Sequence, residues 1–390
     1  MKTMIFYELK KMFSFRKTLV CAAAAAAVCA IVFFGLASSN SLFENLSDIK
    51  QELNAAGEIN ERAENVRKRY EEIISDPNNY IEEDGEMIFA PSAEIIKEME
   101  NFEEILYKDT ISNYPQRIIW NLQEDLKGSD ISGNEELLIK QNIEMVSRRG
   151  SMIAGYNLFY DYYNSFVKYY APLLLGFLIL FFTAPVFSNE YTVKTDGLIL
   201  SSKRGKRGVI IAKFAAALIG VTLMYILVMG VYILISGSVL GFSGGQTSLT
   251  ATYYDVYQYI ETPYNYTMFQ FLMLSLASAW AACIGFGIFT LFISSVIRNT
   301  LAVSAVSSAV FYLPLFYCSA AGRRESLTGV INFSYGRIMQ TAPLIDFFDG
   351  FVLFGNVIMI KEAALFMLAA VSLILGFSAY RSFRHRQAAN

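Results

Sequence analysis

Six long apolar stretches are the feature of this sequence that most constrains its fold. They lie at residues 19–37, 167–187, 209–236, 268–296, 301–320 and 363–380. At a rise of about 1.5 Å per residue, each is long enough as a helix to cross a hydrocarbon layer of about 30 Å. The chain is 54% apolar and 17% charged, which suits such a protein. The sequence therefore predicts an all-α integral membrane protein with six transmembrane helices.

The first apolar stretch could also be the core of a cleaved signal peptide. Basic residues precede it, and Gly35-Leu36-Ala37-Ser38-Ser39 follows an alanine-rich run. The stretch is longer than the usual core of about 7–15 residues, and the segment before it is long. We therefore favour a retained transmembrane helix at residues 18–37.

Lysine and arginine gather in the segments on one side of the predicted helices. These are the N-terminal segment, the connector between the second and third helices, the turn at Arg298 and the tail at 382–390, whereas the loop at 237–267 has neither residue. By the positive-inside rule both termini are predicted to be cytoplasmic. The long insert at 38–166, with 26 acidic against 12 basic residues, is then extracytoplasmic, although long loops carry little weight in this rule.

The insert is predicted to be helical. Apolar residues recur at helical spacing through 49–73 and again through 95–106, and a third helix is expected at 135–148. Turns are expected at Asp76-Pro77-Asn78-Asn79 and at Glu83-Asp84-Gly85. These helices would bury their apolar faces in a hairpin or small bundle, and a self-pairing coiled coil is the alternative.

The N-terminal segment, residues 1–17, has the pattern of an amphipathic helix. Met4, Ile5, Leu9, Met12 and Phe13 recur at helical spacing beside basic residues. Such a helix suits the cytoplasmic headgroup layer, and the alternative is a simple basic anchor. Its candidate functional residues are Glu8, Lys10 and Lys11.

Tyrosine is concentrated at 156–170, before the second helix, and at 253–266, between the third and fourth helices. Tyrosine has an apolar ring and a polar hydroxyl, so both clusters are predicted to lie at the outer membrane interface. A surface for an amphipathic substrate is the alternative.

Signatures of catalysis are lacking. The sequence has one histidine, His385, and contains no H-E-x-x-H motif, no paired C-x-x-C motif and no G-x-x-x-x-G-K-[ST] phosphate loop. We therefore expect no enzyme, no catalytic residue, no metal site and no bound cofactor. Charges are scarce within the predicted helices, which argues against a secondary transporter.

The connector after the second helix resembles the corresponding segment of type-2 ATP-binding-cassette (ABC) exporter permeases. The matching residues are Glu190, Thr195, the run 198–201, Lys206, Arg207 and Lys213. Lys194 stands where the family usually has glycine, and Lys203 where it usually has proline. The amphipathic N-terminal helix and six spans with both ends inside also resemble this family. The resemblance implies that residues 332–360, between the fifth and sixth helices, re-enter the membrane from outside.

The residues of the connector, 188–208, suggest how it would work. Tyr191, Thr195, Leu198 and Ile199 fall on one face of a helix, and Glu190 can pair with a lysine four residues later. An exposed apolar stripe suits a groove on a partner protein, and an ordinary basic loop is the alternative. The candidate ATPase-coupling residues are Glu190, Tyr191, Lys194, Thr195, Leu198, Ile199, Lys206 and Arg207.

The resemblance implies a permease subunit that moves its substrate out of the cell. Two cytoplasmic ABC ATPase subunits would bind ATP and Mg and hydrolyse the ATP, and a second permease, identical or related, would complete the complex. We expect an amphipathic substrate such as a peptide, a lipid-linked molecule or a hydrophobic toxin, contact with membrane lipid, no nucleic-acid partner, and a place in the plasma membrane of a bacterial cell. The alternatives are a sodium exporter and a non-transporting receptor or scaffold that presents a coiled-coil-like extracellular domain.

Overall fold

The computed structural model describes residues 2–39, 42, 46, 59–83, 86–92, 95–96, 114–128, 131–150, 152–192, 205–252, 259–321 and 328–385. Within this part of the chain, six helices are long and apolar enough to cross a membrane. They are Arg16–Ser39, Leu158–Tyr191, Gly208–Leu240, Met268–Val296, Thr300–Tyr317 and Ile360–Phe383. The six predicted stretches are thus confirmed as candidate membrane spans. The second begins nine residues earlier than predicted, at Leu158 rather than Val167.

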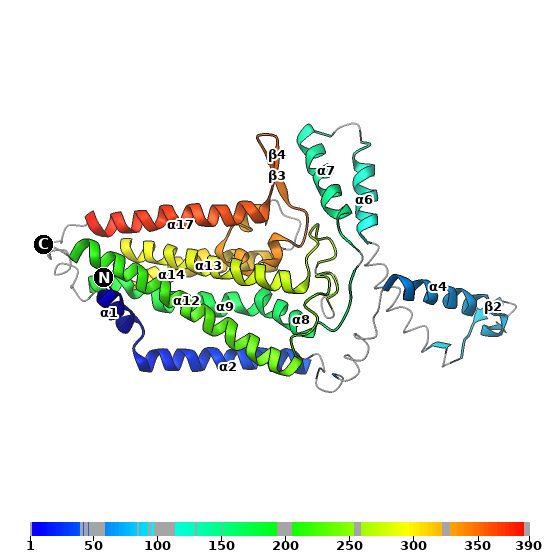
Figure 1. Cartoon of the computed structure of the whole chain (residues 1–390), viewed down its shortest axis with the longest axis horizontal. Helices are drawn as coiled ribbons and strands as arrows, with labels where there is room; N and C mark the ends of the chain where they lie inside the picture. The colour runs from blue at the N-terminus through cyan, green and yellow to red at the C-terminus, as the bar shows by residue number, and fades with distance from the viewer. Residues whose placement is uncertain are drawn as a thin grey trace.

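The six spans lie side by side in one elongated bundle (Figure 1). Five are the single helices α2 (Phe15–Ser39), α12 (Gly205–Leu240), α13 (Met268–Val296), α14 (Thr300–Ala321) and α17 (Ile360–His385). The second span has four pieces: α8 (Leu158–Ser165), the π-helical turn η2 (Phe166–Tyr170), α9 (Ala171–Thr183) and α10 (Pro185–Thr192). Both chain ends lie at one end of the bundle, which we call the termini side, and the residues between α2 and α8 emerge at the other, the insert side (Figure 1).

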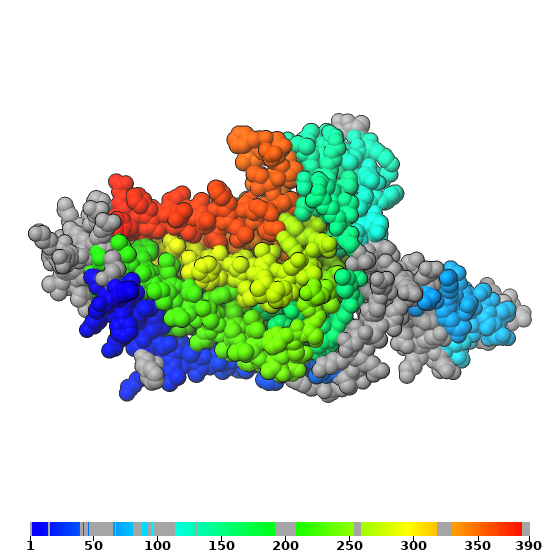
Figure 2. All heavy atoms as spheres, viewed as in Figure 1, coloured from blue at the N-terminus to red at the C-terminus, as the bar shows by residue number. Residues whose placement is uncertain are grey.

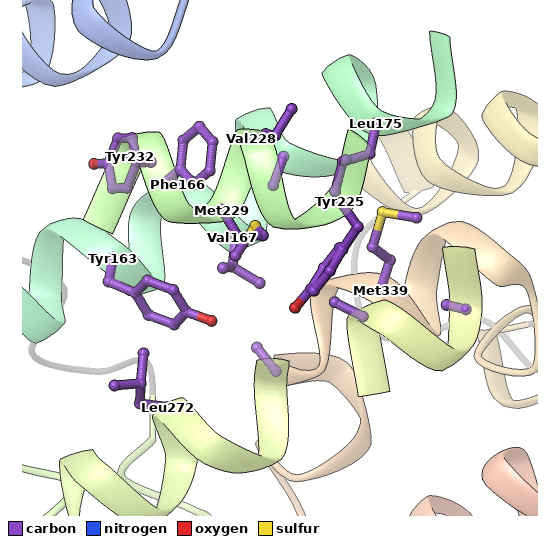
Figure 3. Packing of buried hydrophobic residues seen from close by; sticks show 14 of the residues in the cluster. Tyr163, Phe166, Val167, Leu175, Tyr225, Val228, Met229, Tyr232, Leu272 and Met339 are labelled. Carbon is purple, nitrogen blue, oxygen red and sulfur yellow. The ribbon is translucent and has the colours of Figure 1, made fainter. Parts of the chain in front are cut away.

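Helix α13 lies at the centre and packs against α9, α12, α14 and α17. Aromatic rings fill much of the adjoining core (Figure 3). The ring of Phe166 stacks on that of Tyr232 with centroids 3.7 Å apart. The hydroxyls of Tyr163 and Ser275 are 2.7 Å apart, and Tyr232 donates a hydrogen bond to the carbonyl of Tyr162. The bundle is therefore held by packing and by polar contacts that are satisfied inside it.

Most of the tyrosines at 156–170, which were predicted to lie at the outer membrane interface, pack against other parts of the protein. Tyr156, Tyr160, Tyr162 and Tyr163 are buried in the protein, whereas Tyr169 is exposed. Burial of a tyrosine is tolerated where its hydroxyl has a partner: Tyr156 donates to the carbonyl of Leu240, and the hydroxyl of Tyr163 bonds that of Ser275. In the second cluster, residues 253–258 lie outside the described part of the chain, Tyr259 is buried, and Tyr264 and Tyr266 are half-buried.

The described part of the insert has more than helices. It comprises α4 (Ile59–Ser75), the 3-10 turn η1 (Pro77–Asn79), β1 (Tyr80–Glu83), β2 (Glu86–Phe89), α6 (Tyr114–Asp125) and α7 (Gly133–Ser147). The first expected turn is present as η1, whereas Asp84 and Gly85 of the second lie outside the described residues. Strands β1 and β2, on either side of those two residues, form an unpredicted antiparallel hairpin. Short runs of aromatic and β-branched residues beside that turn favour strands over helices. The third expected helix is confirmed as α7, which begins with a capping box between Ser132 and Glu135.

Helices α6 and α7 pack together as a helical hairpin, although α6 was not predicted (Figure 1). The predicted helix at 95–106 lies almost wholly outside the described residues. Figure 2 shows α4 and the β1–β2 hairpin standing apart from the bundle beyond its insert side.

The segment between α14 and α17 contains α15 (Thr328–Ile331), α16 (Tyr335–Gln340), the turn η3 (Ala342–Leu344), β3 (Gly350–Leu353) and β4 (Asn356–Met359). Helix α16 packs inside the bundle against α9, α13 and α14, and its Ile338 and Met339 are fully buried. Gly336 allows this approach, since a Cβ atom there would lie 2.7 Å from the side chain of Leu315. The turn η3 that follows is buried as well, at Ala342 and Leu344.

Candidate functional site

Four charged side chains from three helices meet at the termini side of the bundle. Lys213, in the third turn of α12, places its Nζ atom 2.8 Å from Oε1 of Glu190 and 3.0 Å from Oε2 of Glu8. Glu190 belongs to α10 and Glu8 to the N-terminal helix α1 (Lys2–Met12). Lys11 of α1 donates to the same oxygen of Glu190. We call Glu8, Lys11, Glu190 and Lys213 the charge cluster.

Burial makes the pairing within the charge cluster obligatory. The side chains of Lys213 and Glu190 are only 1% and 4% exposed, whereas Lys11 is 55% exposed. A lysine ammonium has three donors, and those of Lys213 have three acceptors: Glu190, Glu8 and the carbonyl oxygen of Val186 at 3.4 Å. A buried charge that loses its partners carries a large desolvation cost. Lys213 therefore ties α1, α10 and α12 together.

A break in the second span positions Glu190. Pro185 has no backbone N–H, so the helix is interrupted between α9 and α10. Ser294 of α13 compensates: its Oγ atom accepts from the backbone N–H groups of Phe187 and Ser188 at 3.1 and 3.0 Å and donates to the carbonyl of Ala184 at 2.7 Å. The segment that carries Glu190 is thereby bound to α13 as well as to α12.

Helix α1 is held against the bundle by Phe13, which follows it. The ring of Phe13 stacks on that of Phe182 in α9, with centroids 4.6 Å apart. On α12 the ring occupies the space above Gly220, where a Cβ atom would come within 2.4 Å of it. Met4 lies over Gly208, where a Cβ atom would be at an ordinary contact distance of 3.6 Å. Gly220 is therefore the glycine of α12 that the position of Phe13 requires.

An apolar cluster surrounds the end of α10. Phe187 packs against Phe214 of α12 and Phe383 of α17, with ring centroids 5.7 and 4.9 Å apart. Tyr191 lies against Phe383 and donates its hydroxyl hydrogen to the carbonyl of Ser295, 3.1 Å away. The last residues of the second span therefore contact α12, α13 and α17. A displacement of α10 would disturb its packing against all three of these helices.

A cavity of about 320 Å³ opens beside the charge cluster. Its lining combines apolar side chains of the second span, among them Leu180, Phe181 and Phe182, with charged side chains. The charged lining residues are Lys11, Lys17, Lys213 and Glu8. Such a cavity can take a molecule with an apolar body and a polar or anionic group.

The structure brings part of the predicted site together. Glu190, Glu8 and Lys11 lie in the charge cluster, Tyr191 packs beside it, and Lys10 is exposed on α1. Residues 193–204, with Lys194, Thr195, Leu198 and Ile199, lie outside the described part of the chain. Lys206 and Arg207 fall in the first turn of α12, and their side chains are likewise outside the description.

The sequence reasoning missed the part that Lys213 plays. It treated Lys213 as a motif position and regarded charges in the spans as scarce. The available signal was a lone lysine inside the third apolar stretch, which must find an acceptor there, and a glutamate near the end of the second. With the second span extended, Asp161, Lys168 and Glu190 also fall within candidate spans. Among the described residues, no group of three or more His, Cys, Asp or Glu side chains could hold a metal ion.

Comparison with known proteins identifies the family of the chain. The model of one family, described as ABC-2 family transporter protein, matches residues 8–381. None of the curated proteins matches the chain. The match begins at Glu8 of the charge cluster and includes all six candidate spans except two residues beyond Arg381. The chain belongs to the ABC-2 family of transporter membrane proteins, as a multi-span permease that lacks the ATPase.

Proposed function

We propose that this chain is the permease subunit of an exporter that moves an amphipathic substrate out of the cell. ABC-2 permeases pair with ABC ATPase subunits, which hydrolyse the ATP. In our proposal two such ATPases and a second permease, identical or related, complete the transporter. Both termini and residues 193–204 would lie in the cytoplasm, where the ATPases bind.

The observation that carries this proposal is the buried contact of Lys213 with Glu190 and Glu8. This contact joins the two ends of the segment 193–204, because Glu190 belongs to α10, which precedes the segment, and Lys213 belongs to α12, which follows it. A force applied to the segment would reach both spans through one rigid junction. The apolar face of Leu198 and Ile199 would enter the ATPase groove, and Lys206 and Arg207 would flank it.

The mixed walls of the cavity support an amphipathic substrate. Phe181 and Phe182 offer apolar surface, and Lys17 and Lys11 offer positive charge at the same opening. The lining has three lysines against one carboxylate, Glu8, and this excess of positive charge disfavours a sodium ion. The described spans also place no set of carboxylates suited to a metal ion along a path through the bundle.

The test uses the permease co-expressed and purified with its ATPase and placed in lipid nanodiscs. Steady-state hydrolysis of Mg-ATP is measured with an anionic lysophospholipid, with a cationic amphipathic peptide and with sodium chloride. Stimulation by an amphiphile, lost when Ser304→Trp fills the cavity, supports the proposal. Stimulation by sodium alone, or failure of any ABC ATPase to purify with the chain, would refute it.

A further inference from the structure

The β3–β4 hairpin projects sideways from the insert side of the bundle (Figure 1). Its strands pair antiparallel from Gly350 with Met359 to Leu353 with Asn356, and Phe354-Gly355 forms the tip. The hairpin runs directly into α17 at Ile360 and lies crosswise to the long axes of the spans (Figure 1). Because the spans cross the membrane along those axes, the hairpin extends along the membrane plane.

One face of the hairpin is covered by the insert. Helix α7 packs against both β3 and β4, and it lies beyond them, on the side away from the spans (Figure 1). Along β3 the exposure alternates: Gly350 and Val352 are half-buried, whereas Phe351 and Leu353 are exposed. Side chains of a strand point alternately to its two faces. The face with Phe351 and Leu353 is therefore the open one, and it is turned back towards the membrane beside α17.

The open face and the tip are mainly apolar, with one polar side chain, Asn356, opposite Leu353. Residues 350–359 include no charged side chain. Phe351 and Leu353 are 40% and 45% exposed, and Phe354 at the tip is 95% exposed. A two-stranded hairpin is marginally stable in water, and a protruding apolar patch marks a surface that meets another apolar phase.

The backbone at the tip strengthens this argument. Phe354 has φ of 50° and Gly355 has φ of 79°. Tight hairpin turns with two positive φ values favour Asn or Asp at the first position, because bulky residues are strained there. Phenylalanine at this position is thus unfavourable for the turn itself, and a gain elsewhere must offset its cost.

The neighbouring surface indicates what the open face meets. Exposed apolar side chains continue down α17, which belongs to a candidate span: Phe366, Leu373, Ile374 and Phe377. Between them and the hairpin, Lys361 donates to the hydroxyl of Tyr266 and lies 4.1 Å from the ring centroid of Tyr264. Lysine and tyrosine are typical of the headgroup level of a membrane. The hairpin begins at that level.

We propose that the β3–β4 hairpin is a membrane anchor. Phe351, Leu353 and Phe354 enter the boundary between headgroups and acyl chains in the leaflet on the insert side. The hairpin thereby holds the α6–α7 hairpin close to the membrane surface. The partner is the lipid itself, bound through apolar contact without recognition of a particular headgroup. This inference requires the spans and does not depend on the proposed transport function.

The test measures where the hairpin tip lies in the full-length protein in lipid nanodiscs. Cys21, Cys29, Cys283 and Cys318 are replaced by alanine, and a nitroxide is attached at F354C. Collisions with oxygen, which is enriched in lipid, are compared with those of a water-soluble nickel complex by electron paramagnetic resonance. L373C on α17 provides the lipid reference, and E136C on the exposed face of α7 provides the water reference.

The anchor predicts an F354C label that favours oxygen, closer to the L373C reference than to E136C. A label that favours the nickel complex would place the tip in water and overturn the proposal. Low collision with both agents would indicate protein contact, such as a second copy of the chain, and would also overturn it. Because substitution at the tip could alter the turn, a label at L353C is measured with and without F354N. Asparagine suits the turn but not lipid, so F354N should move the label towards the nickel complex, and an unchanged label counts against the anchor.

Discussion

Nζ of Lys213 lies 2.8 Å from Oε1 of Glu190, with both side chains almost fully buried. The two residues are 23 positions apart and stand on opposite sides of residues 193–204. Glu8 of the N-terminal helix completes the arrangement at 3.0 Å. The contact therefore fixes the end of the second span to the start of the third and to α1. In our account it makes these three helices respond as one unit to the ATPase.

Loss of Lys213 should destabilise the protein strongly. K213M leaves Glu190 with Lys11 and removes the lysine partner of Glu8, and breaking a buried pair costs about 3–5 kcal/mol. The double variant E8Q/K213M should be more stable than K213M, because it removes the carboxylate that K213M leaves without its lysine. The unfolding temperature of each variant is measured by heating samples and recording, by size-exclusion chromatography, how much folded protein remains.

The matched control for this prediction is K140M. Lys140 pairs with Glu136 on α7, where both side chains are about half exposed. Such surface pairs contribute about 0–1 kcal/mol, so K140M should unfold close to the parent. If K213M is as stable as K140M, the charge cluster does not hold these helices together.

Ser294 should be required for the fold of the second span. S294A removes the acceptor of the N–H groups of Phe187 and Ser188, and a buried donor without a partner costs about 1–3 kcal/mol. The unfolding temperature should fall. S238A is the control, because exposed Ser238 bonds only to the carbonyl of Ile235 in its own helix. Equal unfolding temperatures for the two variants would contradict the role of Ser294.

Gly220 should be required for the seating of α1. In G220A the new methyl group would meet the ring of Phe13, which is already stacked on Phe182. The side chains of Lys10 and Lys11 are already exposed, but detached α1 should unfold more readily and be cleaved by trypsin after them more rapidly. Limited proteolysis with mass spectrometry measures the rate of cleavage.

G230A is the control for this experiment. Gly230 lies in the same helix with nothing within 4 Å of the position of an added Cβ. Alanine is the better helix former by about 1 kcal/mol, so G230A should not be cleaved faster than the parent. Cleavage that is equally slow in G220A would show that Phe13 does not depend on Gly220.

Orientation in the membrane is tested by cysteine labelling in intact cells. In a variant without native cysteines, cysteines at Glu104 and Gln246 should react with an impermeant thiol reagent, and one at Lys206 should react only after permeabilisation. The basic segments at 194–207 and the loop at 237–267, which lacks lysine and arginine, give this expectation. Labelling of Lys206 from outside would reverse the proposed orientation.

The spans were predictable because hydropathy alone specifies them. The predicted stretch at 268–296 has the same first and last residues as α13. A capping box between Thr267 and Gln270 begins this helix. The second span was predicted too short because its first turns contain Asp161 and Asn164 among tyrosines. Polar residues there are buried against other helices, and the sequence of one segment does not indicate what its neighbours will cover.

The candidate site was only partly predictable for the same reason. Glu190, Glu8 and Lys11 could be selected from local patterns, but their meeting at Lys213 joins residues up to 205 positions apart. The β3–β4 hairpin was also missed. Its tip residue, Phe354, is unusual for a turn, and a local pattern predicts the usual residues.

We propose that residues 188–208 receive the force of ATP hydrolysis, and this proposal makes a prediction that one pair of variants can refute. L198D/I199D would place two charges on the face that should enter the ATPase groove. Desolvating an unpaired charge costs several kcal/mol, enough to weaken binding by about a thousandfold. The control S201D/S202D adds the same charges to the polar part of the segment. Both variants should reach the membrane in normal amount, because acidic residues have little influence on insertion.

The measurement that tests the account most directly is the amount of ABC ATPase that purifies with each variant from membranes, together with its hydrolysis of Mg-ATP. We predict that L198D/I199D retains little ATPase and little hydrolysis, whereas S201D/S202D retains both. If L198D/I199D purifies with as much ATPase as the parent does, residues 188–208 form only a topological loop, and the proposed coupling is wrong.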